Sequence, residues 1–290
     1  MKRVGFCYHP ALEGARPLAE RLAEQTRQRG IAVWLAALAW EHVDRSLAEQ
    51  VPGSDLLVCV GGDGTVLHAC EIAARVGTPV FGVRIGRLGF LCEVTADEAE
   101  PALARVLNGE ARLERRTMVQ AQFGGREAAH ALNDVVIGRR GLGRTISVGV
   151  RIENVLIAEY RADAVIVATA TGSTGYTISV GGPILYPTSD EMVLVPVAPH
   201  LSRNNALVLP ADTRVQLEVA RGFEAYITVD GQLEQPVPSG AVVEVSRSPR
   251  TADFLRLGGS SQFYANVARR LGWLRADHVF GSPDRQADER

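Results

Sequence analysis

Within roughly the first 100 residues, short apolar runs alternate with stretches whose apolar residues have helical spacing. The apolar runs predict strands over residues 3–8, 31–37, 56–60 and 79–83. The helical spacing predicts helices over residues 16–28 and 65–76. Strands that alternate with helices indicate a parallel sheet with crossover helices, and nearly continuous apolar strands fit a sheet covered on both faces. We therefore expect an α/β domain at the N-terminus.

After about residue 110, apolar residues alternate singly with polar ones. In the segment 145–154, Ile146, Val148 and Val150 fall on one face, and Ser147 falls on the other. The same alternation recurs over residues 214–220, 224–230 and 241–247. Strands with one polar face, separated by turn residues, predict an antiparallel sandwich or layered sheet.

The last part of the chain carries one more helical pattern. Phe263, Val267 and Leu271 recur at intervals of four residues and predict an amphipathic helix, whereas the polar segment 275–290 predicts a frayed tail. We therefore expect a Rossmann-like α/β domain with a parallel sheet over residues 1–105 and an all-β, layered antiparallel sandwich over 106–255. A closing C-terminal helix over 256–290 is expected to pack back on the first domain.

The composition adds limits rather than a function. With 290 residues, 46% of them hydrophobic and 22% charged, the chain can form two ordinary globular domains. A formal net charge of -2 gives no field that would draw it to nucleic acid or to an anionic membrane. It contains neither a signal-peptide core nor an apolar run as long as a membrane span. We expect a soluble, cytoplasmic protein.

The cysteines and histidines do not indicate a metal site. Cys7, Cys59, Cys70 and Cys92 lie mostly in apolar contexts, without a CxxC pair or zinc-ligand spacing, so we expect reduced and mostly buried thiols. The six histidines are scattered. No residue is therefore predicted as a metal ligand.

The sequence Gly61-Gly62-Asp63-Gly64-Thr65 follows the strand predicted over 56–60 and opens directly into a predicted helix. The first amides of a helix have no partners within it, and the helix dipole adds partial positive charge there. Glycines let the backbone approach a phosphate closely. The turn therefore predicts a phosphate cradle, although it is neither a P-loop nor a complete Rossmann fingerprint.

Asp63 adds a carboxylate to this predicted phosphate site. A carboxylate beside a polyphosphate is repelled unless a cation or a proton transfer accounts for it, and a phosphoryl-transfer site provides both. The alternative is an aspartate that caps the helix by accepting a hydrogen bond from an amide two residues on. The turn alone does not decide between these two interpretations.

A second cluster, residues 163–187, also joins a predicted buried strand to small residues that could bind a ligand. The apolar run 164–168 predicts a buried strand, and it leads into small glycyl and hydroxylic residues over 169–179. Such a segment offers many hydrogen-bonding groups with little steric obstruction, and Tyr176 could stack on a base or ribose. The alternative is a polar loop in which Tyr176 packs into the core.

Six motifs in this order resemble the NAD kinase family, which transfers a phosphoryl group to the adenosine 2′-hydroxyl of NAD. The motifs are GGDGTVLHA (61–69), GRLGFL (86–91), LNDVVIGR (132–139), DAVIVATATGSTGYTISVGGP (163–183), PVAPH (196–200) and DGQ (230–232). Diacylglycerol and sphingosine kinases share the GGDGT turn but lack the second cluster.

The resemblance implies a role for each matching position. Asp63 would accept the proton of the ribose hydroxyl or orient that hydroxyl with a metal ion. The ligand-binding positions would be Gly61, Gly62, Gly64, Thr65, His68, Asn133, Asp134, Arg144, Arg161, Asp163, Thr174, Gly175, Tyr176, Thr177, Ile178, Ser179 and Gln232. Among these, 61–65 would cradle phosphate and 174–179 would line the adenosine pocket.

Each position also has a structural alternative. Asn133 and Asp134 could form a turn, Arg144 and Arg161 could be solvated surface charges, and Asp163 could cap a strand end. The chain also departs from the usual family residues. It has Asp134 for glutamate, Arg84 for asparagine, Ala170 for proline and Gly175 for alanine.

The family therefore implies a kinase that uses ATP or inorganic polyphosphate, a divalent cation such as Mg²⁺, and NAD as acceptor. The family and the exposed strands of the second half also imply a homodimer or homotetramer. Two other functions stay open on the sequence. One is a lipid or sugar kinase built on the same turn, and the other is a dinucleotide-binding regulator without catalysis.

Overall fold

The computed structural model describes residues 1–38, 45–86, 89–139, 141, 145–200 and 205–273. Residues 1–257 form one compact unit, and a second unit begins at Gly258. Within the described residues, no helix is long and apolar enough to cross a membrane.

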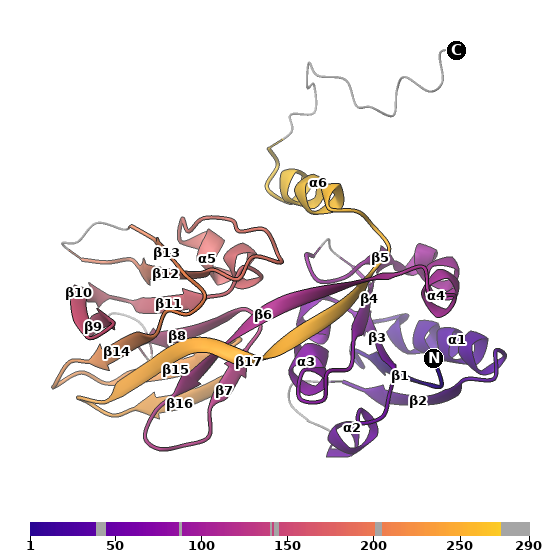
Figure 1. Ribbon diagram of the computed structural model, residues 1–290, viewed down its shortest axis with the longest axis horizontal. Helices are drawn as coiled ribbons and strands as arrows, with labels where there is room; N and C mark the ends of the chain where they lie inside the picture. Colours follow the sequence, from indigo (N-terminus) through magenta and orange to yellow (C-terminus); the bar gives the residue numbers. More distant parts are fainter. Residues whose placement is uncertain (39–44, 87–88, 140, 142–144, 201–204, 274–290) are drawn as a thin grey trace, which may run out of the picture. The chain divides into compact units, whose positions relative to one another are not determined.

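The N-terminal part is an α/β arrangement, as predicted (Figure 1). Its strands are β1 (Arg3–Tyr8), β2 (Ala32–Ala37), β3 (Leu56–Gly61), β4 (Val80–Arg84) and the short β5 (Val94–Thr95). Its helices are α1 (Ala15–Arg27), α2 (Arg45–Gln50), α3 (Asp63–Ala73), the 3-10 turn η1 (Ala96–Glu98) and α4 (Ala99–Leu107). The strands lie in the order β2-β1-β3-β4-β5, and all these pairs are parallel.

Both faces of this sheet are covered, which explains its nearly continuous apolar strands. Neighbouring residues of β1 point into different cores, with Phe6 packed beside α1 and α4, and Cys7 packed beside α3. The four cysteines are free thiols, and three of them are buried, which confirms the prediction.

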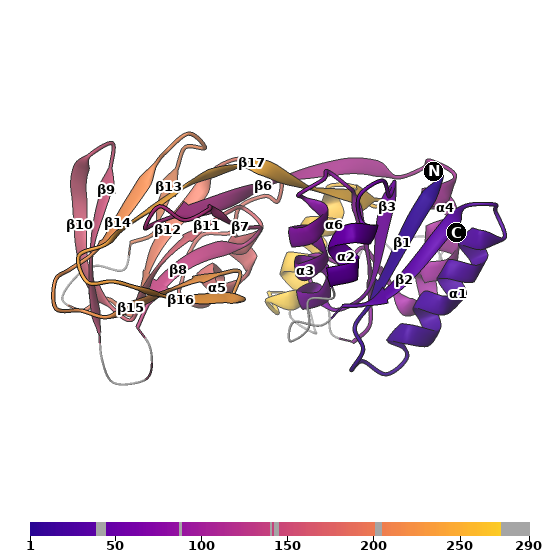
Figure 2. The same cartoon turned by 90° about the horizontal axis from the view of Figure 1, so that it is seen from below.

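The second half is an antiparallel arrangement of two sheets, which confirms the predicted sandwich (Figure 2). One sheet has the order β13-β12-β11-β8-β15-β16. Its strands are β8 (Asp134–Gly138), β11 (Ala164–Ala168), β12 (Met192–Val197), β13 (Leu207–Leu209), β15 (Ala225–Val229) and β16 (Leu233–Val237). The facing strands include β9 (Ile146–Ile152), β10 (Val155–Ala162) and β14 (Val215–Val219), and one shared apolar core lies between the layers.

Two long strands join the halves into one sheet. The antiparallel pair β6 (Arg112–Gln122) and β17 (Val242–Arg256) runs from the sandwich to the α/β part, with β7 (Ala129–Ala131) paired to β6 (Figures 1 and 2). At its far end β17 pairs with β4 through Phe254 and Val80. The strand predicted over 241–247 is therefore only the first half of β17. The rest is hidden by a polar stretch with Pro249, where the β6–β17 register shifts.

The second unit contains α6 (Ser261–Arg270), which confirms the predicted C-terminal helix. Its packing on the first domain stays a prediction, as do the domain boundaries at 105 and 255. The predicted tail, 275–290, lies outside the described residues.

Candidate active site

The glycine turn joins β3 to α3 as the sequence predicts. β3 ends at Gly61, Gly62 is the extended N-cap residue, and α3 begins at Asp63. A Cβ on Gly61 would lie 2.3 Å from the Thr65 hydroxyl oxygen, so only glycine fits there. Nothing lies within 4 Å of the corresponding position on Gly62, and Gly64 is exposed. The N-terminus of α3 is therefore open to a ligand such as a phosphate.

Asp63 does not cap its own helix. The helix has no side-chain cap hydrogen bond, and the Asp63 carboxylate instead accepts two from another loop. The Phe90 amide donates to Oδ2 at 2.6 Å, and the Leu91 amide donates to Oδ1 at 3.1 Å. Gly89 leaves the space for this contact, since a Cβ there would lie 1.9 Å from Oδ1. The local-cap interpretation is therefore wrong, and the carboxylate is half-buried at the mouth of the turn.

The pair Asn133–Asp134 lies between two other segments. Asp230, in the β15–β16 loop, accepts hydrogen bonds from the amides of Leu132, Asn133 and Asp134 at 2.8, 2.7 and 3.1 Å. It holds an αL conformation with φ 53°, which the Asp-Gly turn accommodates. Asp134 is buried and begins β8, so it is not part of an exposed turn.

Burial changes the charge of this carboxylate pair. It raises the pKa of Asp134 to about 7, with a further contribution from the charge on Asp230. Burial likewise raises the pKa of Asp230 to about 6, although three backbone amides oppose the shift. Near neutral pH, Asp134 is therefore partly protonated.

The glycyl and hydroxylic segment packs directly against Asn133. A Cβ on Gly172 would lie 2.0 Å from the Asn133 carbonyl oxygen, and the Thr169 amide donates to that oxygen at 2.9 Å. The segment is not an irregular polar loop throughout, because it forms η2 (Gly172–Thr174) and the short α5 (Tyr176–Ser179). Hydroxyl groups stabilise these turns, as in the bond from the Ser173 hydroxyl to the Ala170 carbonyl at 2.6 Å.

The predicted adenosine-pocket residues differ in exposure. Thr174 and Thr177 are buried, Gly175 and Ile178 are half-buried, and Tyr176 and Ser179 are exposed. Tyr176 is 45% exposed, so the interpretation as a core tyrosine is wrong and its ring is available for stacking.

Arg161 and Asp163 form a separate group at the junction of β10 and β11. Asp163 pairs with Arg139 at 2.9 Å, and this hydrogen bond lowers its pKa. The exposed Arg161 donates through Nε to the Thr145 hydroxyl at 3.2 Å, and its carbonyl accepts from the His200 amide at 2.7 Å. Arg144, also predicted here, lies outside the described residues.

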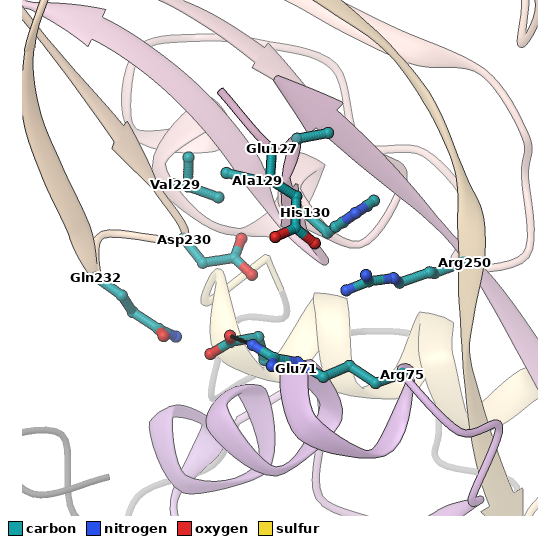
Figure 3. Close-up of a pocket in the computed structure, with 10 residues that line it drawn as sticks. Glu71, Arg75, Glu127, Ala129, His130, Val229, Asp230, Gln232 and Arg250 are labelled. Carbon is teal, nitrogen blue, oxygen red and sulfur yellow. Dashed lines mark hydrogen bonds and ion pairs between the residues drawn. The ribbon is translucent and has the colours of Figure 1, made fainter. Parts of the chain in front are cut away.

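A polar cavity of about 310 Å³ lies at the C-terminal end of α3 (Figure 3). Glu71 of α3 and Arg75 in the turn after it face Asp230 and Gln232 across the cavity. Its remaining lining residues are Glu127, Ala128, Ala129, His130, Val229 and Arg250. In the described part of the chain, Gln232 Nε2 is buried without a hydrogen-bond partner. Asp230 and Gln232 connect this cavity to the Asn133–Asp134 segment.

His68 lies on the same side of α3. Gly64, His68 and Glu71 recur at i, i+4 and i+7 on α3, so they form one stripe from the glycine turn to the cavity. His68 is buried, and this burial lowers its pKa, which favours the neutral imidazole.

Two parts of the site were not predicted as such. The contacts from Phe90 and Leu91 are made by backbone amides, so no residue type in the sequence marks them, although GRLGFL is one of the family motifs. Asp230 could have been found from its Asp-Gly pair between two alternating strands, because this pair is a strong hairpin signal.

Comparisons with known proteins agree with this arrangement. Family models described as the ATP-NAD kinase N-terminal and C-terminal domains match residues 13–111 and 132–257. The chain belongs to the NAD kinase family. NAD kinases of Chloroflexus aurantiacus and Dehalococcoides mccartyi are 37% and 34% identical to it over 93% of this chain, which is 99% and 96% of their own lengths.

Solved structures of the family share the fold. A yeast NADH kinase complexed with NADH superposes with a TM-score of 0.85 at 20% identity, over 97% of this chain and 90% of that one. An Archaeoglobus fulgidus NAD kinase in complex with ATP gives a TM-score of 0.76 at 25% identity, over 94% and 100%. Membership confirms the predicted enzyme, a kinase that acts on NAD. It also decides against a lipid or sugar kinase, because both halves of the chain match.

Proposed function

We propose that this enzyme transfers the γ-phosphoryl group of ATP to the adenosine 2′-hydroxyl of NAD, with Asp63 as the proton acceptor. The hydroxyl oxygen forms a bond to phosphorus, the bond to ADP breaks, and the hydroxyl proton passes to the Asp63 carboxylate. The observation that carries this role is the position of Asp63. It begins α3 beside open glycines, and two backbone amides hold its carboxylate at the mouth of the turn.

The acceptor side is assigned to the segments that pack around Asn133. Asn133, Asp134 and the residues 174–179 would hold the adenosine, with Tyr176 as the stacking surface. Ser179 and the amide of Gln232 offer further polar contacts. Arg161 and Asp163, with Arg144, would contact the more distant part of the dinucleotide. In this arrangement, the enzyme works by positioning and electrostatics, without a covalent intermediate.

The donor is assigned to the stripe along α3. Its phosphates would lie on the amides of 62–65, and Glu71 lies about 12 Å further along the helix at a rise of 1.5 Å per residue. An extended ATP could therefore place its nucleoside in the cavity that Arg75, Gln232 and Arg250 line. Glu71, Glu127 and Asp230 offset the charge of the two arginines there, so the cavity suits a nucleoside better than further phosphates of inorganic polyphosphate.

Magnesium would enter this site bound to the phosphates of ATP. In the described residues, no group of three acidic, histidine or cysteine side chains could hold a metal. Magnesium takes most of its ligands from phosphates and water, so one protein carboxylate suffices, and Asp63 is the residue that would contribute it. When bound, the ion neutralises charge on the transferred phosphoryl group.

We also propose a homo-oligomer in the cytoplasm. β10 is the last strand of its sheet in the described part of the chain, and Val155, Leu156 and Ile157 on it are 62%, 42% and 41% exposed. An exposed apolar edge strand favours pairing with another chain, here a second copy.

The central test replaces Asp63 with asparagine. The amide keeps the size of the side chain but cannot accept the proton, so kcat is expected to fall by about 10²-fold or more while NAD binding stays within about threefold. NADP formed from NAD, ATP and Mg²⁺ is measured with an NADP-specific dehydrogenase, and NAD binding is measured by calorimetry. Asp97→Asn, at an exposed carboxylate in η1, is the matched control. A near-normal rate for Asp63→Asn rejects the assigned role, and NAD binding without any product from the wild type supports the regulator.

Replacing Arg250 tests the donor site. Arg250→Met removes a cation from the cavity and leaves the glycine turn untouched, so KM for ATP is expected to rise about 3- to 10-fold. KM for NAD should not change. With inorganic polyphosphate as donor, we expect little product, and equal rates with both donors would contradict the assignment of the cavity to a nucleoside.

A further inference from the structure

Leu91 donates its amide hydrogen to Asp63, and its carbonyl oxygen is in turn bound by Arg256. Arg256, the last residue of β17, is only 5% exposed. Its Nη1 donates to the Leu91 carbonyl at 2.9 Å and to Glu93 Oε2 at 3.1 Å, and its Nε donates to Glu114 Oε1 at 3.1 Å. The guanidinium thus connects the end of a long strand to the loop at the catalytic turn.

The surroundings fix this guanidinium. Arg116 donates to the same Glu114 oxygen through Nε and Nη2, at 3.1 and 2.9 Å. Arg116 and Arg256 also lie over the Phe254 ring, 4.8 and 4.7 Å from its centroid. Burial alone would raise the pKa of Glu114, but Arg116, Arg256 and a hydrogen bond from Arg112 outweigh it and hold the pKa at about 2. Glu114 is therefore a permanent anion between two buried cations.

Leu91 is the connecting residue. Its amide donates to Asp63, and its carbonyl accepts from Arg256, so both polar groups of one residue are engaged. Glu93 secures the same loop from the other side, because its Oε1 accepts the Leu257 amide at 2.7 Å. A shift of Arg256 would therefore move the amide that Asp63 relies on.

We infer that Arg256 is a positioning residue for the reaction, which acts through the Leu91 peptide to fix the Asp63 carboxylate against the acceptor hydroxyl. This inference rests on the proposed role of Asp63. Its rationale is the steep dependence of catalysis on geometry, because a misplacement of about 1 Å can lower a rate about 10²-fold. The hydrogen-bond partners of Arg256 are Leu91, Glu93 and Glu114, and none of them is assigned to the dinucleotide, so the effect belongs to kcat rather than to NAD binding.

The test compares Arg256→Met with Arg116→Met in the full chain. Both variants remove a buried guanidinium from Glu114 and from the Phe254 ring, but only Arg256 contacts the Leu91 carbonyl. Both should lose similar stability in urea unfolding. Arg256→Met should lower kcat about 10²-fold, with KM for NAD within about threefold, whereas Arg116→Met should keep kcat within about threefold. Arg256→Lys should recover at least about tenfold of the loss, because an ammonium can still donate to the carbonyl.

Each result decides a different question. Equal loss of kcat in the two methionine variants, or a rise in KM for NAD that accounts for the whole loss in Arg256→Met, overturns the inference. A wild type that makes no NADP overturns the proposed function instead. If Arg256→Met does not fold, Glu93→Gln takes its place, since it weakens the hold on Nη1 but preserves shape. It should lower kcat about tenfold, and an unchanged kcat in this variant counts against Arg256.

Discussion

The raised pKa of the buried Asp134 carboxyl makes the stability of the enzyme depend on pH. An unfolded aspartate has a pKa near 3.8, whereas burial raises the pKa of Asp134 to about 7 in the folded protein. The folded state therefore binds more protons than the unfolded state between these values. The contribution of Asp134 to stability therefore falls as pH rises through this window, because the slope follows the difference in bound protons.

We predict that Asp134→Asn flattens this dependence. An amide cannot ionise, so the free energy of unfolding should shift in favour of the variant, relative to wild type, by up to about 1.4 kcal/mol per pH unit between pH 5 and 7. Urea unfolding at pH 5, 6, 7 and 8 measures the shift. Asp163→Asn is the control, because the pKa of Asp163 is lowered and its contribution changes only below this range. Parallel pH profiles for wild type and Asp134→Asn would disprove a raised pKa at Asp134.

At the scale of elements, the contact between η2 and the Asn133 segment has the tightest fit in the proposed acceptor site. Gly172 has no space for a side chain because the Asn133 carbonyl oxygen occupies it. Two chain segments far apart in sequence thus meet backbone to backbone, and Asp230 binds the same segment from another side. The proposed acceptor site is therefore assembled from three loops that only the fold brings together.

Gly172→Ala should separate these elements. A Cβ placed 2.0 Å from a carbonyl oxygen forces one backbone to move, so we expect KM for NAD to rise about tenfold or more. The α3 stripe is untouched, so KM for ATP should change little. Gly149→Ala, where the nearest atom would be 3.6 Å away, is the control for adding a methyl group. Equal effects on both substrates would indicate general unfolding rather than a local shift.

The same elements show what the sequence can and cannot predict. Regular patterns predict β1 to β4, α1, β9, β14 and α6, because burial on one or both faces requires apolar residues at a regular spacing or in continuous runs. The second half of β17 is not predictable from such a pattern, because its polar residues and Pro249 belong to an irregular strand that spans both halves of the chain. Asp63 is predictable from its glycines, whereas the Leu91 amide and the Arg256 contact are not, since tertiary packing alone brings them together.

The whole molecule adds a surface that the active site does not explain. β10 ends its sheet in the described region, and it exposes Val155 and Ile157 together with Arg161, which is assigned to the dinucleotide. An edge strand leaves unpaired backbone groups along one side, and apolar side chains there add a hydrophobic reason to associate. Association along β10 would also bury Arg161 or bring it close to the second copy.

We therefore predict that charges on β10 dissociate the protein. The double variant Val155→Glu, Ile157→Glu places like charges opposite each other in a self-paired edge, so light scattering should show a monomer where the wild type is a dimer or tetramer. The substituted side chains are exposed, so thermal unfolding of the separated subunit should stay cooperative. Val76→Glu, at a side chain that is 48% exposed outside the sandwich, should leave the assembly intact. A monomeric wild type, or an unchanged mass in the double variant, would rule out β10 as the interface. A monomer that also has a raised KM for NAD would indicate that Arg161 needs the second copy in order to contact the dinucleotide.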